Sequence, residues 1–153
     1  MVIETPDRLQ RKETTMSRES RRLAAILLIV FPTVVFGGAS LLSMLIGNVD
    51  GYQDNPIRQD LWRAGHAHAG VLLILSLVFL RYVDDAQLSE RAKSLTRVSV
   101  PTAAILLPVA FFLSVLSPDA TEPNAIIYLA FPGAVILVAG MLSLGVGLWR
   151  ASR

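Results

Sequence analysis

Four long apolar segments alternate with short polar ones along the chain, at about 23–46, 64–82, 98–116 and 126–148. Each segment has roughly the 20 residues that a helix needs to cross a hydrocarbon core of about 30 Å. Backbone groups inside a bilayer must find their hydrogen-bond partners within the protein, so each segment is expected to be an α-helix. The pattern predicts an all-α, polytopic membrane protein built as a four-transmembrane-helix bundle.

The composition agrees with this pattern. Of 153 residues, 53% are hydrophobic and 17% are charged, against about 25% charged in an ordinary soluble domain. The chain has no cysteine, which excludes disulfides and cysteine-ligated metal centres. We expect one transmembrane domain over 23–149, a polar, disordered cytoplasmic tail over 1–22 and a short cytoplasmic end over 150–153. Met16 is an alternative start to Met1.

The positive charges predict the orientation. Twelve of the 14 Lys and Arg residues lie before the first span, between spans two and three, or after span four. The two others, Arg58 and Arg63, lie between spans one and two. Cytoplasmic loops carry the excess of Lys and Arg, so both termini are expected to be cytoplasmic in a multi-pass protein of the bacterial cell membrane. These charges are not clustered with stacking aromatic residues, so no nucleic-acid partner is expected.

Helix starts are indicated by capping residues. Asn55 followed by Pro56 is typical of an N-cap with proline in the first helical position, which would start the second helix before its apolar part. Ser89 is a candidate N-cap for the third helix. Glu122 followed by Pro123 predicts the start of the fourth helix in the same way.

Small residues recur at helical spacing in three of the spans. Such stripes allow close helix packing, and we interpret them as packing faces. The alternative interpretation is that they line a transport path. They consist of Gly37 and Ser40 in span one, Gly65, Ala69 and Ser76 in span two, and Gly133, Gly140, Ser143 and Gly147 in span four. The opposite face of span two, with Val71 and Ile74, is expected to face lipid.

His66 and His68 are the only histidines, and apart from Arg63 at the boundary they are the only titratable groups at the depth of a span. Ionisable residues inside a membrane are functional candidates. Residues two apart on a helix diverge by about 200°, so the two imidazoles cannot chelate one ion and should reach different neighbours. Met44 is expected at similar depth, which suggests a His and Met pair on haem or copper. The alternative is an interfacial histidine that hydrogen-bonds the backbone.

The run from Gly65 to Gly70, Gly-His-Ala-His-Ala-Gly, is followed by an apolar stretch. It resembles the His-x-His opening of a transmembrane helix in small, haem–copper-oxidase-like membrane proteins. This resemblance implies that His66 or His68 is a haem ligand, without the further histidines that dioxygen reduction needs. The whole four-span plan resembles uncharacterised small integral membrane proteins of high-GC bacteria, and that resemblance implies no activity.

Other chemistry has no basis in the sequence. Carboxylates occur only outside the spans, and the chain has no phosphate-binding loop and no nucleophile motif. We therefore expect a non-catalytic accessory or interaction component, in contact with the bilayer and with other membrane proteins or itself as a homo-oligomer. The alternatives are a haem- or metal-binding redox or sensor protein using His66 or His68, and a small transporter or channel built on helices broken by Gly and Pro.

Overall fold

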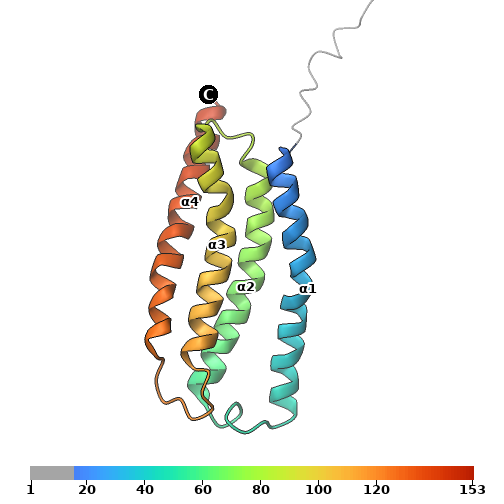
Figure 1. Ribbon diagram of the computed structural model, residues 1–153, viewed down its shortest axis with the longest axis vertical. Coiled ribbons are helices and arrows are strands. Elements are labelled where there is room, and N and C mark those ends of the chain that lie inside the picture. Colours follow the sequence, from blue (N-terminus) through green and yellow to red (C-terminus); the bar gives the residue numbers. More distant parts are fainter. Residues whose placement is uncertain (1–15) are drawn as a thin grey trace, which may run out of the picture.

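The computed structural model describes residues 16–153, and over this range the protein consists of helices with no strand. Its elements are α1 (Arg18–Ile46), α2 (Pro56–Tyr82), α3 (Glu90–Ser114), the short 3₁₀ helix η2 (Ala125–Leu129) and α4 (Ala130–Ala151). The four long helices run side by side, and the start of α1 and the C-terminus lie at the same end (Figure 1). By length and composition, each of the four can cross a membrane.

The helix starts show which capping predictions hold. The side chain of Asn55 accepts a hydrogen bond from the Arg58 N–H, and that of Ser89 accepts one from the Ala92 N–H, so both predicted N-caps are confirmed. The predicted start at Glu122 and Pro123 is wrong. Asn124 caps η2 instead, since its side-chain oxygen accepts a hydrogen bond from the Ile126 N–H. Its side-chain amide also donates to the Leu113 carbonyl near the end of α3.

α1 begins five residues before the expected span. Ser17 is its N-cap and accepts a hydrogen bond from the Ser20 N–H, so residues 18–22 are helical rather than part of a tail. Residues 1–15 of that expected tail lie outside the described residues. The third expected span, 98–116, also differs from the structure at its end. α3 stops at Ser114, two residues before the expected boundary.

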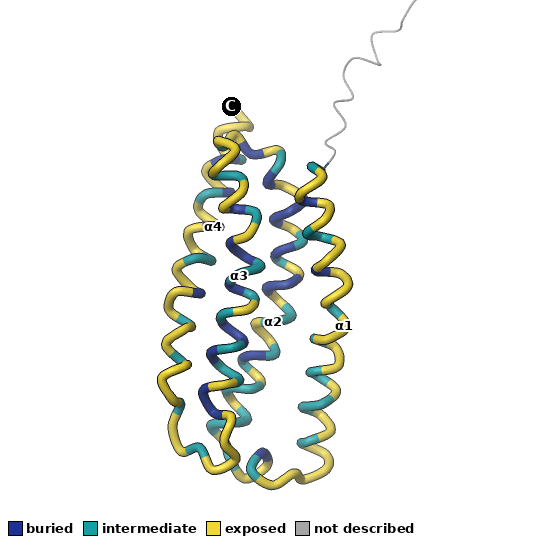
Figure 2. The backbone as a smooth tube through the Cα atoms, in the orientation of Figure 1, coloured by how far each residue is buried: buried dark blue, intermediate teal, exposed yellow. Residues whose placement is uncertain are grey.

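The core lies around α3. Leu72 and Phe79 of α2, Val100 and Leu107 of α3, and Leu144 of α4 belong to one buried cluster. We compared the buried share of an apolar 18-residue window in each helix. It is 44% in α3 but only 6% in α1. Figure 2 shows the buried positions gathered on α2 and α3. α1 therefore lies at the edge of the bundle, where it packs mainly on α2.

The prolines inside the spans do not interrupt the helices. Pro32 lies within α1, and Pro101 and Pro108 lie within α3, and each helix continues through them. The broken helices on which the transporter alternative rests are therefore not found in the described part of the chain.

The two loops at the end opposite the C-terminus are tied together. The Arg58 guanidinium donates to the Gly51 carbonyl at 2.8 Å and to the Leu116 carbonyl at 3.1 Å. Gly51 has a φ of +68°, and a Cβ there would lie 2.5 Å from the Cβ of Pro118. Glycine meets both requirements, a left-handed backbone and the close approach of the second loop.

Candidate functional site

The two histidines lie near the start of α2 and contact different helices. The His66 ring packs against α1, where a Cβ built on Gly38 would lie 2.9 Å from its Nε2 atom. The His68 ring lies 5.1 Å from that of Phe111 on α3, and its Nδ1 atom is 2.7 Å from the Ala64 carbonyl oxygen. The divergence expected from their spacing on a helix is what separates them.

His66 lines a cavity of about 240 Å³ between α1 and α2. The α1 side of this cavity is apolar, and the α2 side carries the imidazole and the guanidinium of Arg63. Its walls are formed by Gly38, Leu41, Leu42, Leu45, Tyr52, Arg63 and His66. We refer to it as the His66 cavity.

Met44 is not among the residues that line this cavity, although Leu42 and Leu45 on either side of it along α1 are. His68 points to the other side of α2, toward Phe111. Within residues 16–153, no three His, Cys, Asp or Glu side chains are grouped so that they could hold a metal ion. The two imidazoles therefore lie apart, and each has its own neighbours.

The small residues of α2 and α4 lie at contacts inside the bundle. A Cβ on Gly65 would lie 3.0 Å from the Phe112 ring, one on Gly133 would lie 3.2 Å from Leu107, and one on Gly147 would lie 2.9 Å from Ala86. Ser76 is fully buried and donates to the Leu72 carbonyl. Ala69 is half-buried on the same side of α2 as Gly65 and Ser76, whereas Val71 and Ile74 are exposed.

On α1 the small residues are less covered. Gly37 is half-buried, and a Cβ there would lie at 3.7 Å from the His66 ring. Ser40 is also half-buried, and its hydroxyl donates to the Phe36 carbonyl within the same helix.

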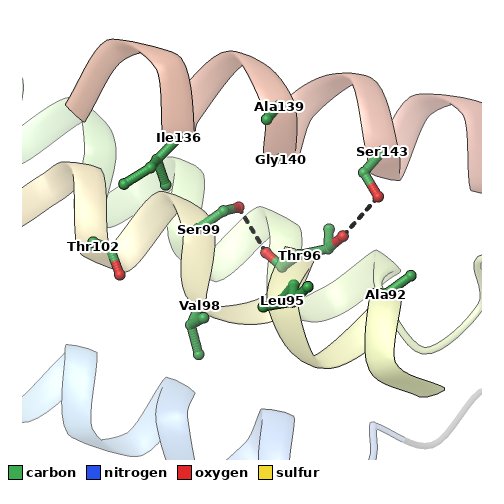
Figure 3. A pocket seen from close by; sticks show the side chains of 10 residues that line it. All are labelled: Ala92, Leu95, Thr96, Val98, Ser99, Thr102, Ile136, Ala139, Gly140 and Ser143. Carbon is green, nitrogen blue, oxygen red and sulfur yellow. Dashed lines mark hydrogen bonds between the residues drawn. The ribbon is translucent and has the colours of Figure 1, made fainter. Parts of the chain in front are cut away.

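A groove of about 460 Å³ between α3 and α4 was not foreseen from the sequence. In Figure 3 the Ser143 hydroxyl points toward Thr96, and the Ser99 hydroxyl points toward the Thr96 backbone. These hydrogen bonds measure 2.8 Å each, so the hydroxyls are satisfied within the bundle. The remaining wall is mostly aliphatic, which leaves the groove without a reactive group.

A polar network joins the start of α1 to the α2–α3 loop and to α3. The Asp84 carboxylate accepts hydrogen bonds from the Ser17 N–H and from Arg97 Nη2, both at 2.9 Å. Arg97 Nε donates to the Ser20 hydroxyl, also at 2.9 Å. The Arg97 and Asp84 side chains are only 12% and 16% exposed. Sequence reasoning missed this network, because its members are up to 80 residues apart.

The pKa of Asp84 reflects two opposing causes. Burial of the carboxylate raises it, but hydrogen bonds from the Ser17 N–H, from the hydroxyls of Ser20 and Ser17 and from Arg97 lower it. The net pKa lies below its ordinary value of 3.8. The carboxylate is therefore charged at neutral pH and forms a short ion pair with Arg97.

Comparison with protein-family models, with curated proteins and with solved structures finds no match for this chain. The class of the protein therefore follows from its own features. Over residues 16–153 it is all-helical, and its four long helices are each apolar enough to cross a membrane, as in a multi-pass membrane protein.

Proposed function

We propose that this protein is a non-catalytic, multi-pass membrane component that associates with another membrane protein or with a second copy of itself through the free face of α1. The observation that carries the proposal is the low burial of α1, since only 6% of its apolar window is covered by the rest of the chain. The small-residue faces of α2 and α4 already serve internal packing, and α1 is the less covered of the two peripheral helices, with 6% of its apolar window buried against 11% for α4.

The free face of α1 has the spacing that helix pairs use. Along this face, exposed positions seven residues apart form three rows. One row has small or narrow residues, Ala25, Pro32 and Ala39. The two other rows have larger apolar residues, Leu28 with Val35 and Ile29 with Phe36. A seven-residue repeat with small residues supports left-handed packing of a second helix.

The orientation is part of the same proposal. The start of α1 and the C-terminus lie at one end of the bundle, together with the α2–α3 loop (Figure 1). Twelve of the 14 Lys and Arg residues lie in the segments at this end or leading to it. The positive-inside rule supports placing this end in the cytoplasm, in the cell membrane of a bacterium.

Disulfide trapping in native membranes tests the association, because the chain has no cysteine of its own. Val35→Cys places a thiol on the free face of α1, and Val135→Cys places one on the outer face of α4. The two positions are matched in residue type and exposure, at 63% and 68%. We expect mild oxidation or a short bifunctional maleimide to link Val35→Cys into a dimer or a defined adduct, and to leave Val135→Cys monomeric.

Two outcomes would contradict the proposal. Equal yields of cross-linked product from both positions would indicate random collision. A monomer at both positions would contradict association through α1. A visible spectrum of the purified protein addresses the haem alternative, since a Soret band lost in His66→Gln or His68→Gln alone would favour a haem protein instead.

A further inference from the structure

Pro32 leaves one backbone acceptor of α1 without its helical donor. A proline has no N–H, so the carbonyl of Leu28, four residues earlier, loses the hydrogen bond that a helix normally supplies. The α-helix nonetheless continues through this point, without a change of helix type that could supply another donor. The nearest side-chain donor along the chain is Thr33, and its hydroxyl donates to the Val30 carbonyl at 2.8 Å instead. Within the described residues, no side chain donates to the Leu28 carbonyl.

This carbonyl lies on the free face of α1, at the depth of the lipid acyl chains. Leu28 is 58% exposed, and Pro32 is exposed one turn later on the same face. Leu28 is also the sixth residue of the apolar stretch that begins at Leu23, about 7.5 Å along the helix axis from its start. An unsatisfied backbone group is strongly unfavourable in hydrocarbon, and prolines are tolerated in membrane helices where a neighbouring helix satisfies the freed carbonyl. The rest of this chain covers the opposite face of α1, where Leu27 packs on α2.

A second α1 helix does not supply the missing donor. In a symmetric pair with the same orientation in the membrane, residues with the same number lie at the same depth. The side-chain donors of α1 nearest to Leu28 are Thr33, about 7.5 Å deeper, and Arg22, about 9 Å nearer to the start of the helix. The guanidinium of Arg22 turns toward the head groups rather than into the hydrocarbon. An α1–α1 pair therefore leaves both Leu28 carbonyls without a donor.

We propose that the free face of α1 binds a transmembrane helix of a different protein, and that a hydroxyl or amide side chain of this helix donates to the Leu28 carbonyl. The inference rests on the proposed association through α1 and identifies the partner by its chemistry. Ala25 and Ala39, in the row of Pro32, allow a close approach of the second helix. Serine and threonine are suitable donors, because they are short and commonly hydrogen-bond across helix pairs in membranes.

Two synthetic transmembrane peptides test this assignment on the full-length protein. Both are helices of leucine and alanine with lysines at their ends. One has a serine at the sixth apolar position from each end, so either orientation brings a hydroxyl to the depth of Leu28, and the other has alanine at both positions. In phosphatidylcholine vesicles, energy transfer to a fluorophore on Arg153→Cys measures the binding of each peptide. We expect the serine peptide to bind about 3- to 30-fold more tightly, which is the range that hydrogen bonds between membrane helices produce.

Three variants locate the effect. Pro32→Ala returns an N–H to this position, so the Leu28 carbonyl is bonded within α1 and the serine peptide should bind no better than the alanine peptide. Pro101→Ala is the matched control, because this proline lies in α3, and it should preserve the preference. Ala39→Leu enlarges the row of small residues about 10.5 Å from Pro32, so it should weaken both peptides by a similar factor and leave their ratio unchanged.

Several results would overturn the proposal. These are equal binding of the two peptides by the wild type, binding of neither peptide, or a preference for serine that survives Pro32→Ala. If that variant does not fold, Pro32→Leu restores the same N–H and should equally remove the preference. Linking of Val35→Cys only to a second copy of the chain in native membranes would also contradict the partner assignment, while association through α1 would stand.

Discussion

The glycines of α4 differ sharply in what surrounds them. A Cβ on Gly140 would overlap the Ser99 hydroxyl and would lie 2.6 Å from the Ser99 Cβ. A Cβ on Gly145, five residues later on the same helix, would meet no atom within 4 Å. The first glycine is required by the approach of α3, and the second is not required by any contact in the described part of the chain.

We therefore predict opposite outcomes for two identical substitutions. Gly140→Ala should lower the free energy of unfolding by about 1–3 kcal/mol, because the methyl group overpacks the contact with Ser99. Gly145→Ala should cause no loss, since alanine is the better helix former and the site is open. Reversible unfolding in mixed micelles measures both. A loss of the same size in Gly145→Ala would mean that an additional surface covers this side of α4.

Such residue-level contacts are only partly accessible to sequence reasoning. The seven-residue spacing of Gly133, Gly140 and Gly147 places them on one face of a helix, but does not say what they face. The divergence of His66 and His68 follows from helix geometry alone. That His66 packs on Gly38 depends on which helix lies beside α2, which no local pattern determines.

At the scale of elements, local chemistry predicts most of the helices. Four apolar stretches become four helices, and Asn55 and Ser89 cap two of them as expected. The early start of α1 is different. Its first turns are rich in charge and have the composition of a tail, and the partner that holds them is Asp84, 67 residues away from Ser17. Only the packed bundle brings that carboxylate to the N-cap.

Asp84→Asn should therefore loosen the start of α1. The substitution leaves Arg97 without its carboxylate, and loss of a charged hydrogen bond at a mostly buried site costs about 1.5–3 kcal/mol. Asp85→Asn is the control, because Asp85 pairs with Arg81 at an exposed site where such a pair contributes about 0–1 kcal/mol. Unfolding at neutral pH, with amide hydrogen exchange over residues 18–24, measures both effects.

The lowered pKa of Asp84 adds a pH dependence to this comparison. A carboxyl whose folded-state pKa lies below its unfolded value stabilises the fold above that unfolded value, and the stabilisation is lost as the pH falls through the folded pKa. The difference between wild type and Asp84→Asn should thus be constant at neutral pH and should shrink below a pH of about 3.8. A difference that stays constant in acid would show that the carboxylate charge is not what holds α1.

At the scale of the whole molecule, the two ends of the bundle are built differently. One end holds both chain ends of the described structure (Figure 1). The network of Asp84 and Arg97 joins the start of α1 to α3 at this same end. At the other end, Arg58 and Asn55 join the two loops by hydrogen bonds to backbone carbonyls. Lys and Arg are abundant at the first end and scarce at the second. The proposed orientation, with the first end in the cytoplasm, rests on this asymmetry.

Labelling of single cysteines tests that orientation. Asp119→Cys lies in the loop before η2, and Gln87→Cys lies in the α2–α3 loop, and both positions are exposed. In intact cells, a membrane-impermeant maleimide should label Asp119→Cys and should reach Gln87→Cys only after permeabilisation. The two thiols lie in loops at opposite ends of the four-helix bundle. The reverse labelling pattern would therefore show that the whole chain has the opposite orientation. Inversion would place the His66 cavity in the cytoplasmic leaflet, and labelling of both positions in intact cells would mean that the chain inserts in two orientations.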